Sequence, residues 1–145
     1  MLISTREGGG PVTEFELKRL ERELRIRLPA DYRRFLLRFN GGRPEPAEFE
    51  LESDGEAVPW RLHIFFSVND AIESCRIGWN HRVTRETRPK DVVPIATDEC
   101  GNFLYLGVGS GGFEGVYFGA MPSNGEQVHL VRLAESFDAF LAKLH

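Results

Sequence analysis

Two short amphipathic helices, joined by a proline corner, are the feature that most constrains this fold. Between residues 14 and 27, apolar side chains recur every three or four positions with Arg and Glu between them, which predicts a helix with one buried face. Thr13 can cap the first free N–H groups of this helix, and Glu16 completes a capping box. The helix should end near Arg27, because Pro29 disfavours helical geometry in the residue before it.

A second helix is expected directly after this corner, with Pro29 in its first turn, where a missing N–H is no loss. Its apolar side chains fall at i, i+3, i+4 and i+7, namely Tyr32, Phe35, Leu36 and Phe39. Asn40, Gly41 and Gly42 tolerate left-handed backbone geometry and should stop it. Each helix presents one apolar stripe, so the rest of the chain must supply a surface that covers both.

Beyond residue 43, the pattern is mostly that of β-strands. Alternation or short apolar runs predict strands at residues 48–52, 60–66, 92–96, 103–108, 115–118 and 127–131. Residues 103–106 are apolar on both faces, as expected for a central strand covered by helices.

The remaining elements are helices and one loop. A short helix over residues 69–79 would bury Ala71, Ile72, Cys75 and Trp79, and the polar, Arg-rich residues 80–90 would form an exposed loop. Ser136 caps a last helix with apolar residues at Phe137, Phe140, Leu141 and Leu144. Strands between helices at the two ends predict one α+β domain over residues 1–145, with a mainly antiparallel or mixed sheet.

Composition narrows the class of protein. A chain of 145 residues is long enough to bury a stable core without disulfides or structural metals. Its two cysteines, Cys75 and Cys100, are too few for a disulfide framework. No apolar run suits a signal peptide or a membrane span, so a cytoplasmic protein without membrane contact is expected.

The net charge of −4 is unevenly distributed. Residues 1–43 carry ten basic and six acidic side chains, whereas residues 44–145 carry eight basic and sixteen acidic ones. Residues 44–57 hold six acids and no base: Glu45, Glu48, Glu50, Glu52, Asp54 and Glu56. Such a run is either a solvated strand edge, kept from pairing by like charges, or a surface that steers a basic partner. Nucleic acid does not suit it, because phosphates need positive charge. In the first helix, Arg19, Arg22, Arg25 and Arg27 alternate with Glu at pairing distance, which predicts a largely neutralised, solvated face.

Candidate chemistry is sparse. Residues 107–112 match G-x-G-x-x-G, but a strand and not a helix follows, which favours a connection between strands over a dinucleotide loop. Asp98 and Glu99 could act as acid and base or bind a hard cation, but Asp with Gly-Asn is also typical of a turn. Cys100 with His129 could form a nucleophile pair, though no third orienting group can be named. The histidines show no metal-ligand spacing, so no metal, cofactor or catalytic set is predicted.

Two stretches carry a resemblance to a known family. Residues 28–36 read LPADYRRFL and are followed by NGG at 40–42, and residues 93–98 read VPIATD and lead to Gly101-Asn102 and an apolar strand. Together with the last strands and the closing helix, they resemble the SUKH superfamily from about Thr13 to Leu144. The inserted Glu99-Cys100 and the glycine-rich residues 107–115 depart from its pattern, but only in loops. The motif residues are expected to be structural: Leu28, Pro29, Tyr32, Asn40, Gly41, Gly42, Asp98, Gly101 and Asn102.

The resemblance implies a protein-binding scaffold without general enzymatic activity. It suggests an immunity protein that binds and neutralises a cognate toxin, such as a basic nuclease-type domain, in a bacterial polymorphic toxin system. The alternatives are a regulatory adaptor, as the fungal cell-wall-regulator relatives suggest, and a small enzyme using Asp98, Glu99, Cys100 or His129. The partner surface is expected to combine charge with an apolar anchor and to include Glu48, Glu50, Glu52, Asp54, Trp60, Phe113 and Glu114.

Overall fold

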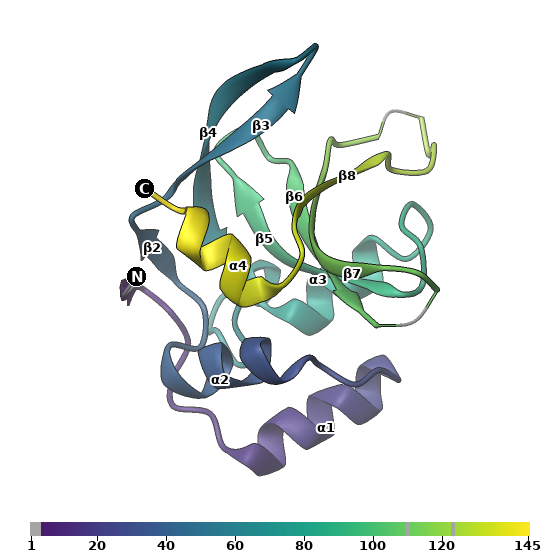
Figure 1. Ribbon diagram of the computed structural model, residues 1–145. Coiled ribbons are helices and arrows are strands. Elements are labelled where there is room, and N and C mark those ends of the chain that lie inside the picture. The colour runs from purple at the N-terminus through teal and green to yellow at the C-terminus, as the bar shows by residue number, and fades with distance from the viewer. Residues whose placement is uncertain (1–3, 110, 123) are drawn as a thin grey trace.

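The computed structural model describes residues 4–109, 111–122 and 124–145. These parts contain four α-helices, one 3₁₀ helix and eight strands (Figure 1). In chain order the elements are β1 (Ser4–Arg6), α1 (Glu14–Leu24), α2 (Ala30–Arg38), β2 (Arg43–Glu45), β3 (Glu48–Ser53), β4 (Glu56–Phe65), η1 (Glu73–Cys75), α3 (Ile77–Val83), β5 (Val92–Asp98), β6 (Phe103–Val108), β7 (Glu114–Gly119), β8 (Leu130–Ala134) and α4 (Phe137–Lys143).

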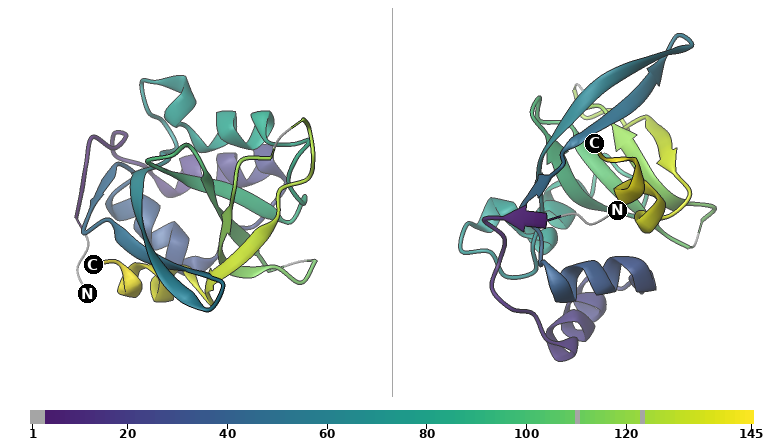
Figure 2. Two further views of the ribbon diagram at one scale, coloured as in Figure 1. Left: turned by 90° about the horizontal axis from the view of Figure 1, so that it is seen from above. Right: turned by 60° about the vertical axis from the view of Figure 1, so that its left-hand side comes forward.

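Strands β3 to β8 form one antiparallel sheet in chain order, and β1 pairs with β2 in a separate ribbon. The sheet is curled (Figure 2). Residues of its two edge strands, β3 and β8, line one shared hollow. Helices α1 and α2 lie at one end of the sheet, and the β3–β4 hairpin projects from the other end (Figure 1). The expected α+β fold, with a helix pair before the sheet and a helix after it, is confirmed.

Helix α1 begins as its sequence predicts but ends earlier. The Thr13 hydroxyl accepts a hydrogen bond from the Glu16 N–H at 3.2 Å and caps the helix. The helix ends at Leu24 and not near Arg27, because Arg25 adopts left-handed geometry with φ 58°. The Ile26 N–H then donates back to the Glu21 carbonyl at 3.1 Å, which satisfies the last turn before Pro29 is reached.

The main core lies between helices α1, α2 and α4 and one face of the sheet. The predicted stripe residues of α1 and α2 are buried there, and three rings meet at its centre: Phe35 of α2, Phe65 of β4 and Phe137 of α4, with centroids 5.0 to 5.9 Å apart. Removing one such ring costs about 3–5 kcal/mol in comparable cores. The helices therefore pack on the sheet through the same apolar stripes from which the sequence predicts them.

The second face of the central strands holds a smaller core, formed by Val92, Tyr105, Tyr117 and Val128. It confirms that β6 is buried on both sides, but irregular segments cover this face where helices were expected. The Val128 N–H donates to the Thr87 carbonyl at 2.7 Å and so joins the two covering segments. This contact also explains why β8 begins at Leu130 and not at residue 127, as predicted.

The predictions for residues 69–90 are wrong. Instead of a helix over 69–79, the chain bends, forms η1 and enters α3 at Ile77. Ala71 and Ile72 are exposed, while Cys75 and Trp79 are only half-buried. Asp70 is the cause, because its carboxylate accepts from the Ile72 N–H and its carbonyl accepts from the Arg76 side chain, which closes a turn.

Residues 80–90 are not an exposed loop, since Asn80, Thr84 and Arg88 are buried. The Arg88 guanidinium donates to the Thr84 hydroxyl and to three carbonyls, including that of His81 at 2.9 Å near the end of α3. Carbonyls at a helix C-terminus favour a cation, and burial lowers the pKa of Arg88. These polar side chains order a segment that has too few apolar ones to do so.

Strand β4 is longer than predicted and irregular. It begins at Glu56, and its register shifts between Leu62 and Ile64. The alternation expected for residues 60–66 is therefore broken, and Phe65 and Phe66 are both buried.

Candidate protein-binding surfaces

The acidic residues 44–57 build most of a projecting hairpin. Phe49 and Leu51 of β3 face the core, with the Phe49 ring 5.8 Å from Phe140, so the carboxylates between them face outward as the alternation predicts. Strand β4 returns after a turn in which Asp54 and Gly55 have φ 52° and 80°, the geometry that Asp-Gly favours in tight hairpins. The hairpin projects from the body in Figure 1 and in the right-hand view of Figure 2.

The carboxylates are balanced only near the base of this hairpin. Glu48 pairs with Arg61 at 3.4 Å, and Glu50 lies 3.4 Å from the His145 ring. The ion pairs found among the described residues include none for Glu52, Asp54 or Glu56, which are all exposed. The tip therefore carries concentrated negative charge.

The two aromatic residues expected at the partner surface are half-buried and lie at opposite ends of the sheet. Trp60 packs on Phe118 with ring centroids 5.5 Å apart, beside the base of the acidic hairpin. Phe113 packs edge-on against Tyr117 at 5.6 Å, in the β6–β7 connection near α1 and α2. The exposed Glu114 follows it and lines a hollow of about 770 Å³ under the α1–α2 corner. The residues predicted as one surface thus divide between two.

Of the glycine-rich residues 107–112, Gly107 and Val108 end β6, and Gly109, Gly111 and Gly112 lie in its connection to the antiparallel strand β7. Gly109 and Gly112 both have φ 82°, in the left-handed region that glycine adopts freely. A strand and not a helix follows, so the loop lacks the helix N-terminus on which dinucleotide binding depends.

Asp98 is used within a turn. Its carboxylate is buried and accepts from the Cys100 N–H at 2.9 Å, the Asn102 N–H at 2.8 Å and the Asn102 side chain at 3.0 Å. Gly101 completes the turn with φ 84°. Both carboxylate oxygens of Asp98 therefore hold the β5–β6 connection together.

Of the other residues considered for catalysis, Glu99 and Cys100 line one hollow, and His129 lies apart from them. Glu99 pairs with Arg61 at 3.2 Å, and Cys100 is exposed in a hollow of about 330 Å³ beside Trp60. His129 is exposed just before β8, which β7 separates from β6 in the sheet. Within the described ranges, no group of three or more His, Cys, Asp or Glu side chains is placed to hold a metal ion.

Asn40 holds three parts of the chain together. Its side-chain amide donates to the Gly10 carbonyl and to the Asn69 side chain, both at 2.6 Å, and its side-chain oxygen accepts from the Val68 N–H at 2.9 Å. Asn40 is 3% exposed and has φ 50°, so it ends α2 and also fastens two loops. The prediction from sequence covers only the first of these roles.

The other residues of the leucine–proline and glycine motifs make packing or backbone contacts. Leu28 and Tyr32 are buried, and Pro29 caps α2 without entering its first turn. A Cβ on Gly41 would lie 2.6 Å from the Phe66 carbonyl oxygen, and the Gly42 N–H donates to the Phe65 carbonyl at 2.9 Å. The close approach of this loop to β4 therefore requires glycine.

A model of the SMI1/KNR4 family (SUKH-1) matches residues 11–143, which include the motifs just described and the whole six-stranded sheet. The chain belongs to the SMI1/KNR4 family. A comparison with curated proteins finds no match. No helix in the described parts of this SUKH-1 chain is long and apolar enough to cross a membrane.

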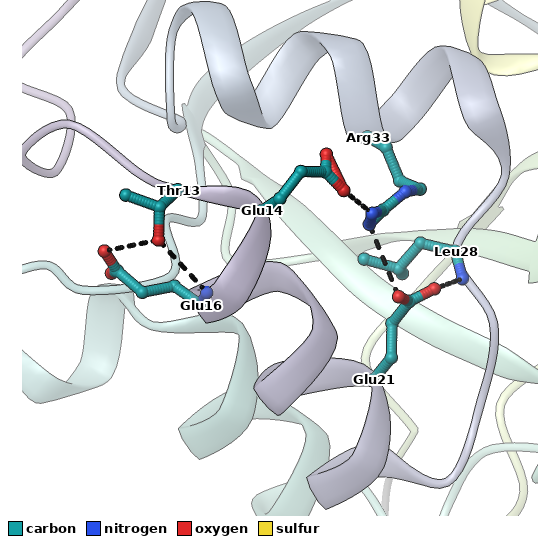
Figure 3. A network of polar contacts seen from close by, with 6 residues as sticks. All are labelled: Thr13, Glu14, Glu16, Glu21, Leu28 and Arg33. Atoms are coloured by element: carbon teal, nitrogen blue, oxygen red, sulfur yellow. Dashed lines mark hydrogen bonds and ion pairs between the residues drawn. The ribbon is translucent and has the colours of Figure 1, made fainter.

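Arg33 joins the two helices of the SUKH-1 frame. Its guanidinium, on α2, pairs with Glu14 and with Glu21 of α1, the latter at 3.3 Å (Figure 3). The second oxygen of Glu21 accepts from the Leu28 N–H at 2.7 Å and fixes the corner between the helices. Two of the carboxylates expected to neutralise α1 are therefore held by α2 instead.

The predicted neutralisation of the α1 arginines is wrong as a result. Among the described residues, Arg19–Glu23, at 3.7 Å, is the one ion pair formed within α1. The C-terminal half of α1 faces residues 81–91 across a groove of about 1050 Å³. Seven of the side chains that line this basic groove are Arg or Lys, and two are acidic. Sequence spacing could not reveal it, because the cations come from segments about 60 residues apart.

Proposed function

We propose that this SUKH-1 protein is an immunity protein that binds a cognate toxin domain and blocks its active site or access to it. Family membership supports a protein-binding role. The observation that carries the finer proposal is the projecting hairpin, whose exposed carboxylates at Glu52, Asp54 and Glu56 lack ion-pair partners among the described residues. Such a surface suits a basic domain, for example a nuclease, because complementary charge speeds the encounter.

In this proposal the protein acts by binding and not by catalysis. The Asp98 carboxylate is occupied by three hydrogen bonds within its turn, and Glu99 is paired with Arg61. Neither arrangement leaves a carboxylate poised toward a substrate, which supports a scaffold over an enzyme.

Co-expression tests the proposal. The toxin would be the product of the gene next to the one that encodes this chain, and cell survival and co-purification would be measured. The proposal predicts survival well above that with an empty vector. It is wrong if survival is no better, or if no toxin gene is adjacent and the chain captures only an unrelated cellular protein, as an adaptor would.

Charge reversal tests the surface. E52K/D54K should weaken toxin capture by about tenfold or more, because reversing two exposed charges changes several pair energies of up to about 1 kcal/mol each. E73K/E126K is the matched control, since both residues are exposed, lie outside the hairpin and change the net charge equally. Equal losses in the two variants would show that net charge matters and that the hairpin does not.

A further inference from the structure

The basic groove between α1 and residues 81–91 concentrates positive charge on a chain that is acidic as a whole. Arg22, Arg25 and Arg27 lie on one side, and Arg85 and Lys90 lie on the other. All five are exposed, and the ion pairs found among the described residues involve none of them. Like charges gathered from two segments repel one another, so folding alone does not explain their placement.

One of the two acids that line this groove is bound to groups outside it. Glu21 holds Arg33 and the Leu28 N–H, as Figure 3 shows. His81, which lines the same groove, adds no charge at neutral pH because burial and the nearby Arg88 and Arg85 lower its pKa to about 4. The groove is therefore cationic through arginine and lysine, whose charge does not vary near neutral pH.

The groove also has an apolar part. Leu24 is buried at its edge, and Ile26 and Val108 are half-buried in its lining. Among the described residues, no Phe, Tyr or Trp side chain lines it, whereas single-stranded nucleic-acid sites commonly use such rings to stack bases. Arginine forks bind carboxylates through paired hydrogen bonds, and apolar side chains favour a ligand that has apolar side chains too.

We propose that this groove binds an acidic segment of a polypeptide, in which Asp or Glu side chains alternate with apolar ones. The carboxylates would contact Arg22, Arg25 and Arg85, and an apolar side chain would pack between Ile26 and Val108. The site lies on the helical side of the molecule, away from the projecting hairpin (Figure 1). It is thus a second surface, with the opposite charge, and does not depend on the immunity proposal.

Fluorescence anisotropy with the full chain tests this site. The probe is a short labelled peptide of alternating Glu and Leu, compared with Gln–Leu and Lys–Leu peptides and with a single-stranded oligonucleotide of equal length. The Glu–Leu peptide should bind most tightly, and its affinity should fall as salt rises. The proposal is overturned if the Gln–Leu peptide binds equally well, or if the oligonucleotide binds more tightly, which would make the groove a nucleic-acid site.

Variants locate the binding. R22E/R85E, with one change on each side of the groove, should lower the affinity for the Glu–Leu peptide by about tenfold. E52K/D54K should leave that affinity unchanged. Equal thermal unfolding of the variants shows that both fold, and unchanged peptide affinity in folded R22E/R85E refutes the site.

Sedimentation of the chain alone tests whether the bound segment belongs to a second copy. Self-association that either double variant abolishes would identify the acidic hairpin of a second copy as the segment bound. Toxin neutralisation by R22E/R85E separates this proposal from the immunity proposal, because each can fail without the other.

Discussion

Replacing Asn40 by Ala should destabilise the protein more than any other single change at the end of α2. The substitution removes three side-chain hydrogen bonds of 2.6 to 2.9 Å and leaves the Val68 N–H without its partner. Each lost bond is worth about 1 kcal/mol, and an unpaired buried donor adds to that loss. Ala also tolerates the φ of 50° about 1 kcal/mol less well than Asn does.

These effects together lower the free energy of unfolding by about 3–5 kcal/mol, a large part of the roughly 5–15 kcal/mol typical of a domain. Urea unfolding followed by circular dichroism measures the change, which corresponds to a melting temperature lower by roughly 8–15 °C. N40G is the matched variant, because it loses the same hydrogen bonds but accepts the backbone geometry, and it should recover about 1 kcal/mol.

Asn69→Ala separates the contacts further. It removes one hydrogen bond, made by an exposed residue, so its effect should stay below about 1 kcal/mol. The reasoning would be refuted if N40A lost less than about 1 kcal/mol, or if N40G were less stable than N40A.

Three further changes test other parts of the frame. Tyr32→Phe should leave stability unchanged or raise it slightly, because the buried Tyr32 hydroxyl has no hydrogen-bond partner among the described residues; a loss above about 1 kcal/mol in urea unfolding would contradict this. His81 has its pKa lowered from 6.5 to about 4, so protonation favours the unfolded chain, and stability should fall by roughly 1–2 kcal/mol, after solvent screening, as pH drops from 6.5 to 4. His81→Gln should flatten that part of the stability–pH curve, and an unchanged slope would assign it to other groups. Gly115→Ala should cost at least about 2 kcal/mol, because its Cβ would lie 2.0 Å from the Ala134 carbonyl oxygen at φ 91°, whereas Gly125→Ala, at φ 73° in open space, should cost only about 1; equal melting temperatures would refute the difference.

Local pattern predicted the elements that carry an apolar stripe or alternation. The stripes of α1, α2 and α4 and the alternation of β3 are each visible within one segment, because burial selects side chains at the period of the backbone. The capping residues Thr13 and Ser136 were also correctly predicted, since a cap acts within three residues of itself.

Residues 69–90 show why the rest could not be predicted. Their conformation depends on polar side chains that bond to backbone groups at irregular spacings. Arg88 bonds to the His81 and Val92 carbonyls, and Gln127, from a segment 41 residues away, bonds to the Glu86 carbonyl. Such contacts leave no periodic trace in the sequence. Ala71, Ile72, Cys75 and Trp79 imitate a helical stripe, yet the turn closed by Asp70 places the first two in solvent.

The two candidate surfaces also differ in whether the sequence could predict them. The acidic hairpin is continuous in sequence, so its charge and alternation could be seen directly. The basic groove could not be predicted in this way. Glu14 and Glu21 do not pair with the arginines of α1, because they pair with Arg33, a residue of another helix.

The pairing of the last residue with β3 determines where a fused tag would go. The His145 N–H and carbonyl both bond to Glu48, at 2.9 and 3.0 Å, as in an antiparallel pair. Because the strands run in opposite directions, residues joined after His145 would pass Ala47 toward β2, away from the hairpin tip. A protein immobilised through such an extension would therefore present both its acidic hairpin and its basic groove to a partner in solution.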